Sequence, residues 1–177
     1  MRGFKSFLML MLGMLTMNTV HAELPGNKGT ESKEQIAEER KNGDWLLYVE
    51  DAYRISKETG KPILANFTGS DWCGWCIRLK NEVFKTDAFI KWAKENVVLL
   101  ELDFPRKTIQ ADDLKAQNAG MQQAFQVGGY PTLWVFNLDF DENTKQYNID
   151  AFGKTGYVAG GAANWISETN TILKQKK

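Results

Sequence analysis

Hydrophobic and polar positions form alternating blocks along the chain, and these blocks predict strands and helices in turn. The apolar run over residues 62–68 is short and ends in the polar turn Gly69-Ser70-Asp71, which is typical of a buried strand. Residues 97–103 form a second run of the same kind. Around these runs, apolar positions recur at the spacing of helices. Four helices are therefore predicted: residues 45–55, a segment beginning at Cys73, residues 87–96 and residues 112–125.

The last third of the chain predicts a hairpin and a closing helix. A strand over 132–136 is joined through a turn over 139–144 to a last strand near 147–152, and a helix over 162–173 follows. A hairpin gives an antiparallel pair, whereas a strand-helix-strand unit gives a parallel one. The sequence therefore predicts an α/β fold with a central mixed β-sheet flanked by helices.

The pattern leaves two local details undecided, the structure of residues 45–48 and the cap of the helix that begins at Cys73. Residues 45–48 fit a short strand as well as the first turn of a helix. Either Ser70 or Asp71 is placed to cap the helix that begins at Cys73, and Asp71 suits that position best. Four apolar side chains of that helix are expected to face the core: Ile77, Leu79, Val83 and Phe84.

The first 22 residues have the pattern of a secretory signal peptide. Arg2 and Lys5 give a positive start, residues 7–15 form an apolar centre, and Val20-His21-Ala22 offers small residues where a signal peptidase reads them. The apolar centre is shorter than the roughly 20 residues needed to span a bilayer. We therefore expect cleavage after Ala22 and a periplasmic or secreted protein.

The rest of the chain has room for one domain. Residues 23–43 are polar and predict a linker or an exposed helix, which leaves residues 44–177 as the folded domain. Once the two basic residues of the signal are removed, the formal charge is about −2, which disfavours nucleic acid as a partner. We expect a monomer.

The only two cysteines lie in Trp72-Cys73-Gly74-Trp75-Cys76, where the first buried strand gives way to a helix. Two thiols three positions apart in a first helical turn share one face and can form a disulfide. The helix N-terminus lowers the pKa of the nearer thiol. We therefore expect Cys73 to be the attacking thiol and Cys76 the resolving thiol.

Other uses of a Cys-x-x-Cys pair lack their partners in this sequence. Structural zinc needs four Cys or His ligands, and the single histidine, His21, lies in the signal. Haem attachment needs a histidine directly after the second cysteine, where Ile77 stands. No metal and no cofactor is expected. A purely structural disulfide is the remaining alternative, although so short a loop gains little from closure.

A second feature completes a resemblance to a known family. The Trp-Cys-x-x-Cys segment after a strand, about 55 residues before Gly129-Tyr130-Pro131-Thr132, resembles the thioredoxin superfamily. Residues 67–76, together with Leu102-Asp103-Phe104-Pro105, are similar more narrowly to exported bacterial thioredoxin-like thiol–disulfide oxidoreductases of the DsbH type. The resemblance covers the chain from Trp45 onward and implies a thioredoxin-like fold.

The resemblance also implies a peptide groove opposite the cysteines. An X-Pro bond is usually trans, but here Pro131 is implied to be a cis-proline facing the disulfide. The Tyr130 backbone is then free to pair with an extended substrate, and Thr132 begins the next strand. Three further substrate-binding residues are implied around the sulfurs: Trp72, Gly74 and Trp75.

The function that the resemblance implies is an extracytoplasmic reductase or isomerase of disulfides in exported proteins, supplied with electrons by a membrane thiol donor. A disulfide oxidase and a non-catalytic peptide-binding module are the alternatives. The chain departs from thioredoxin because Asn66 stands near the position of its buried aspartate, and an amide does not titrate. The proton acceptor for Cys76 is thus open between water, Asp71, and an acid or lysine elsewhere.

Overall fold

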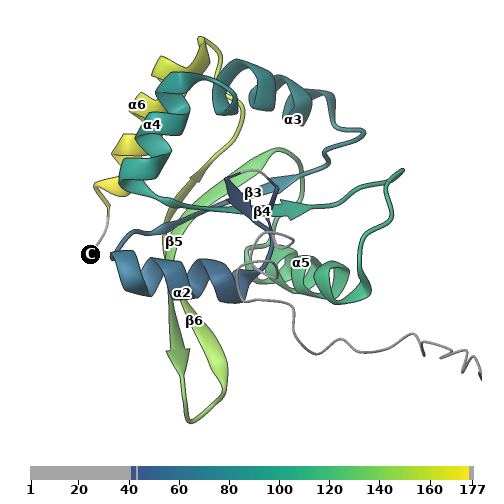
Figure 1. Ribbon diagram of the computed structural model, residues 1–177, viewed down its shortest axis with the longest axis vertical. Coiled ribbons are helices and arrows are strands. Elements are labelled where there is room, and N and C mark those ends of the chain that lie inside the picture. The colour runs from purple at the N-terminus through teal and green to yellow at the C-terminus, as the bar shows by residue number, and fades with distance from the viewer. Residues whose placement is uncertain (1–40, 43, 176–177) are drawn as a thin grey trace, which may run out of the picture. The chain divides into compact units, whose positions relative to one another are not determined.

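The computed structural model describes residues 41–42 and 44–175 (Figure 1). The predicted signal peptide and residues 23–40 of the predicted linker lie outside this range. The strands are β1 Lys41–Asn42, β2 Trp45–Leu46, β3 Ile63–Thr68, β4 Val98–Asp103, β5 Thr132–Asp141 and β6 Gln146–Thr155. The helices are α2 Val49–Thr59, α3 Gly74–Leu79, the π-helical η1 Lys80–Phe84, α4 Asp87–Asn96, α5 Asp112–Ala124 and α6 Gly161–Leu173.

The strands form one mixed sheet in the order β1-β2-β4-β3-β5-β6. At its centre, β3 and β4 run parallel, in a register that begins with Ile63 opposite Val98 and ends with Thr68 opposite Asp103. Strand β5 is antiparallel to β3, and β6 is antiparallel to β5 at the sheet edge. The predicted α/β fold with a mixed sheet is therefore confirmed.

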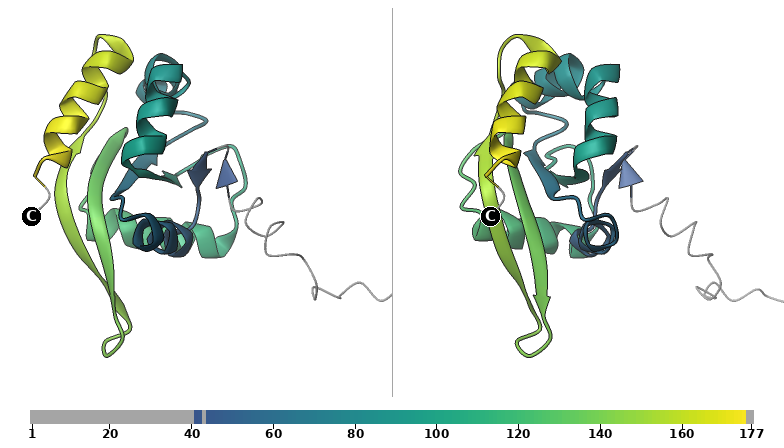
Figure 2. Two further views of the ribbon diagram at one scale, coloured as in Figure 1. Left: turned by 60° about the vertical axis from the view of Figure 1, so that its left-hand side comes forward. Right: turned by 90° about the vertical axis from the view of Figure 1, so that its left-hand side faces the viewer.

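Helices cover both faces of this sheet (Figure 2). Helices α3, α4 and α6 pack on one face, where Leu64 of β3 joins their core. Helices α2 and α5 lie on the other face, which receives Ile63, Ala65 and Phe67 of the same strand. Successive side chains of a strand point to opposite faces, so a strand buried on both sides is apolar throughout. This explains why β3 reads as a continuous hydrophobic run.

Three local expectations need correction or completion. Residues 45–46 form strand β2, and the helix begins only at Val49. Strands β5 and β6 extend beyond the predicted hairpin to a turn at 142–145, where Tyr147 packs on Phe140 and Tyr53. The inward orientation expected for Ile77 is wrong, since this side chain is 43% exposed. Cys76 and Leu79 occupy the inward face of α3, and Ile77 lies about 100° around the helix from Cys76.

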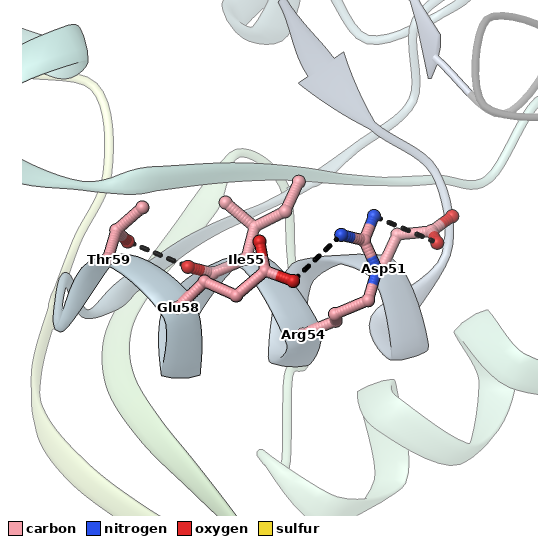
Figure 3. A network of polar contacts seen from close by, with 5 residues as sticks. All are labelled: Asp51, Arg54, Ile55, Glu58 and Thr59. Atoms are coloured by element: carbon pink, nitrogen blue, oxygen red, sulfur yellow. Dashed lines mark hydrogen bonds and ion pairs between the residues drawn. The ribbon is translucent and has the colours of Figure 1, made fainter. Parts of the chain in front are cut away.

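A network of polar contacts runs along helix α2 (Figure 3). Arg54 pairs with Glu58 at 3.2 Å and lies 3.9 Å from Asp51, and the Thr59 hydroxyl donates to the Ile55 carbonyl at 2.7 Å. Such exposed helical pairs contribute only about 0.3–0.5 kcal/mol each. The stability of α2 therefore depends mainly on its inward face, where three side chains are buried: Val49, Ala52 and Ser56.

Candidate active site

The two cysteines lie at the start of α3, after the loop that follows β3. Cys73 is the N-cap residue of α3, and its Sγ accepts a hydrogen bond from the backbone N–H of Cys76 at 3.2 Å. The two residues form a disulfide across a Cα–Cα distance of 5.2 Å, and both are buried. A sulfur at this place faces the free N–H groups and the positive end of the helix dipole, which stabilise a thiolate. The pair is thus arranged for thiol–disulfide exchange.

The cap assigned to Asp71 is wrong, because the sulfur of Cys73 occupies that position. The Asp71 carboxylate instead accepts hydrogen bonds from the backbone N–H groups of Arg106, Lys107 and Thr108, at 3.0, 2.7 and 3.0 Å. These bonds, with that from Arg106 the largest contribution, lower the pKa of Asp71 below its usual 3.8. Asp71 therefore fastens the loop after β4 to the loop that carries the cysteines.

Replacement of Asp71 by Asn should loosen this loop at neutral pH. The folded-state pKa is depressed, so the carboxylate's contribution is complete above the unfolded value near 3.8 and is lost as pH falls through the lower folded value. We expect amide hydrogen exchange at residues 106–108 to accelerate by about tenfold at pH 7. Below pH 3.8 the difference from wild type should narrow.

The control is Asp150→Asn, an exposed aspartate on the edge strand β6. That variant should exchange like wild type at residues 106–108. Unchanged exchange in the Asp71→Asn protein would contradict the fastening role.

A second set of contacts joins the same two loops through Ser70. Its backbone N–H and its hydroxyl both donate to the Asp103 carboxylate, at 2.8 and 2.5 Å. Trp72 donates from Nε1 to the Phe104 carbonyl at 2.8 Å, and the Arg106 guanidinium lies 3.6 Å from the Trp72 ring centroid. The indole beside Cys73 is thereby held on an edge and on a face.

Gly69 makes room for that indole. A Cβ at this position would lie 2.5 Å from Cε2 of Trp72, which is closer than real Cβ contacts come. Any larger residue would have to displace the ring that borders Cys73. The lack of a side chain at Gly69 and the hydrogen bond from Trp72 to the Phe104 carbonyl therefore fix the orientation of the Trp72 ring together.

Trp72 also brings the predicted proline segment to the cysteine loop. Its ring meets Tyr130 edge-on, with centroids 5.8 Å apart. The Tyr130–Pro131 peptide bond is cis, and Thr132 then begins β5 opposite Phe67 of β3. The predicted substrate-binding residues Trp72, Tyr130, Pro131 and Thr132 thus belong to one neighbourhood.

The two residues between the cysteines are both exposed. Gly74 begins α3, and the Trp75 side chain is 55% exposed. The Trp75 ring lies 5.0 Å from that of Tyr157, and the Arg78 guanidinium lies 5.6 Å from Trp75 and 5.2 Å from Tyr157. An aromatic and cationic surface is therefore built around the residue that lies between the two cysteines in the sequence.

A carboxylate holds that surface together. Glu82 accepts a hydrogen bond from the Tyr157 hydroxyl at 2.6 Å and pairs with Arg78 at 2.7 Å. The bond from Tyr157, followed by that from Arg78, lowers the pKa of Glu82, while the same bond raises the pKa of Tyr157. The four-residue spacing of Arg78 and Glu82 was a usable sequence signal, whereas nothing local points to Tyr157.

Within residues 41–42 and 44–175, no group of three or more His, Cys, Asp or Glu side chains is arranged to hold a metal ion. The helices described by the structure include none with the length and apolar character needed to cross a membrane.

Comparison with known proteins agrees with this geometry. Residues 49–144 match the family of thioredoxin-like domains. Disulfide bond reductase DsbH of Chlamydia pneumoniae is 34% identical over 137 residues, which are 75% of this chain and 74% of that protein. Thioredoxin-related protein DsbJ of the same organism is 29% identical over 74% of this chain but only 37% of its own length. The solved structure of a DsbH oxidoreductase superposes with a TM-score of 0.64 at 28% identity, covering 84% of this chain and 95% of that one.

A disulfide-forming Cys-x-x-Cys pair at a helix start, on a mixed sheet covered by helices, defines a thiol–disulfide oxidoreductase. The chain belongs to the thioredoxin-like family. The narrower resemblance to DsbH-type proteins, predicted from residues 67–76 and 102–105, is also confirmed.

Proposed function

We propose that the protein reduces or isomerises disulfides in exported proteins outside the cytoplasm. The observation that carries this proposal is the position of Cys73, whose sulfur caps α3 and accepts the Cys76 N–H. The helix N-terminus would stabilise a thiolate formed there, and 7% of the Cys73 surface is exposed to a partner. The DsbH relative, named a disulfide bond reductase, supports the same direction.

The reaction would proceed in two exchanges that balance atoms and electrons. The Cys73 thiolate attacks one sulfur of a substrate disulfide, forms a mixed disulfide and releases the first substrate thiolate. The Cys76 thiolate then attacks Cys73, closes the enzyme disulfide and releases the second. The substrate gains two electrons and the cysteine pair loses two. A dithiol donor, which we propose to be a membrane thiol protein, must reduce the pair again.

The surroundings of Cys73 favour a reductase over an oxidase. Strong stabilisation of the thiolate makes a pair more oxidising. Among the described residues, the Cys73 sulfur accepts a hydrogen bond from the backbone N–H of Cys76 and from no side chain. The single histidine, His21, belongs to the predicted signal peptide. A Cys73 sulfur without a hydrogen bond from a side chain supports the choice of a reductase.

Substrate contact is proposed for the surfaces on either side of the disulfide. The Tyr130 backbone before the cis-proline would pair with an extended substrate, next to Trp72 and the start of β5 at Thr132. Between the cysteines, the exposed Trp75 and Gly74 would offer a ring and an open backbone to the partner. Aromatic rings supply large contact area at a low entropy cost.

The location and organisation of the chain are part of the proposal. We propose that residues 1–22 are removed as a signal peptide, that residues 23–40 form a linker or exposed helix, and that the rest acts as a monomeric domain. The boundary expected at residue 43 moves to Lys41, because β1 pairs with β2 and belongs to the sheet. The pattern of Arg2, Lys5 and the apolar residues 7–15 supports export.

The redox potential of the cysteine pair tests the direction of electron flow. The purified domain is equilibrated with glutathione or dithiothreitol buffers, and the reduced fraction is read by alkylation and mass spectrometry. We expect a potential of about −270 mV, as in thioredoxins, together with reduction of insulin in the presence of dithiothreitol. A potential of about −120 mV would instead identify an oxidase.

A further inference from the structure

Strand β4 carries a buried carboxyl group close to the cysteine pair. Glu101 is the fourth residue of β4, and only 7% of its surface is exposed. Burial of an ionisable side chain is unfavourable unless its surroundings compensate it, and such groups cluster at functional sites. Among the residues that the structure describes, Glu101 is the only buried charged residue, which makes it a candidate for a role at the nearby site.

The register of the sheet sets Glu101 beside Asn66. The two residues are direct partners across the parallel strands β4 and β3, so their side chains point to the same face. That face carries α3 and the cysteines, because Leu64 and Leu99, two residues earlier on each strand, pack in the core beneath α3 and α4. Asn66 is itself buried, at 4% exposure.

A small cavity connects this pair to the resolving thiol. Its volume is about 20 Å³, and its lining includes Cys76, Asn66, Glu101, Thr68 and Lys80. A space of this size holds one water molecule, and its walls offer polar partners. The Asn66 Oδ1 atom has no hydrogen-bond partner among the residues that the structure describes. A buried acceptor of this kind needs a donor, which a water or a protonated carboxyl would supply.

We infer that Glu101 is the proton acceptor for Cys76, acting through a water in this cavity that Asn66 and Thr68 help to orient. The inference deepens the proposed function, since it concerns the second exchange of the same reaction. Glu101 acts on Cys76 from β4, the strand next to β3. Asn66 of β3, which stands near the position of the buried aspartate of thioredoxin, orients the water through its amide.

The proton follows a balanced path. In the mixed disulfide, the Cys76 S–H gives its proton to the water, which passes one of its own to the Glu101 carboxylate. The Cys76 thiolate then attacks the Cys73 sulfur, forms the internal disulfide and expels the substrate thiolate. Glu101 returns the proton through the same water to solvent or to the leaving thiolate. Lys80 of η1 is the other charged residue that lines the cavity.

The test separates the two exchanges in the full domain. Reduced protein is mixed with a small peptide disulfide, quenched in acid at successive times, and analysed by mass spectrometry. For Glu101→Gln we expect decay of the mixed disulfide to slow by about 10²-fold at pH 7, the lower end of what positioned proton transfer contributes. Formation of the mixed disulfide should stay within about twofold, because Cys73 does not use this carboxyl. The deficit should shrink above about pH 8.5, where thiols ionise unaided.

Two further variants guard against a merely structural effect. Asn66→Asp in the Glu101→Gln protein returns a carboxyl to the same cavity and should restore most of the lost rate. Asn66→Asp alone places two carboxyls side by side, so the pH profile of mixed-disulfide decay should move to higher pH. The matched control is Glu95→Gln, an exposed glutamate of α4, which should behave as wild type.

Two results would overturn the inference: an unchanged decay rate for Glu101→Gln, or equal slowing of both exchanges. Because the substrate is a small peptide disulfide, this outcome does not depend on whether the protein acts as a reductase or as an oxidase. If the wild type completes both exchanges but has the potential of an oxidase, the reductase proposal fails while the role of Glu101 is still decided.

Discussion

Replacement of Cys73 by Ala should reduce insulin-reducing activity by at least about 10³-fold, since it removes the nucleophile itself. Cys73 and Cys76 are the only thiols of the chain, so no other group can take over the attack. The measurement is the rate of insulin precipitation with dithiothreitol at matched protein concentration. Activity above one tenth of the wild-type value would make the disulfide structural and would support the binding-module alternative.

Replacement of Cys76 by Ala should have a different result. Cys73 keeps its place at the N-cap of α3 and still attacks, but the mixed disulfide has no internal thiol to resolve it. We expect the substrate to remain attached and to add its mass to the protein. Ile77→Ala serves as control, because this exposed neighbour of Cys76 leaves both thiols in place and should retain activity within a few-fold.

Replacement of Trp165 by Ala should destabilise the domain by about 3–5 kcal/mol, the range for loss of a large buried aromatic side chain. Trp165 is fully buried on α6 and lies 5.6–5.8 Å, between ring centroids, from Phe84, Phe89 and Trp92. Its Nε1 also donates to the Gly156 carbonyl at 3.1 Å. The substitution would leave a cavity among three rings and one carbonyl without its donor.

The free energy of unfolding in urea measures this effect, with Trp75→Ala as the matched control. Trp75 is the same residue type but is 55% exposed, so its loss should change stability by no more than about 1 kcal/mol. Equal destabilisation by the two substitutions would contradict the assignment of Trp165 to the core. We expect Trp75→Ala to affect substrate turnover more than stability, since its ring borders the disulfide.

Several features of the site could be predicted because their signals are local. Cys73 and Cys76 are three positions apart, and the strand before them is a continuous apolar run, so a helix start with two thiols follows from a short stretch of sequence. The cis state of Pro131 was implied by family resemblance and is present in the structure. Neither result required knowledge of a distant contact.

The assignment of Asp71 as a cap shows where local reasoning ends. Its position before α3 suited capping, but its partners are backbone groups 35 to 37 residues further along the chain. The orientation expected for Ile77 failed for a related reason, because the face that α3 buries depends on how the helix is set on the sheet. Helical spacing alone leaves that rotation undetermined.

The sequence by itself determined the order of the longer strands and helices, the mixed sheet and the cysteine pair of the candidate site. These properties depend on periodicity and on residues within a few positions of each other, which short-range sterics and burial control. Only the tertiary structure decided what surrounds the thiols: Asp71 and Arg106 at the loop after β4, Tyr157 with Glu82, and Glu101 beside Asn66. Asp71 and Arg106 are 35 residues apart in the chain, Glu82 and Tyr157 are 75 apart, and Glu101 meets Asn66 through the register of the sheet. The packing of whole elements brings such residues together.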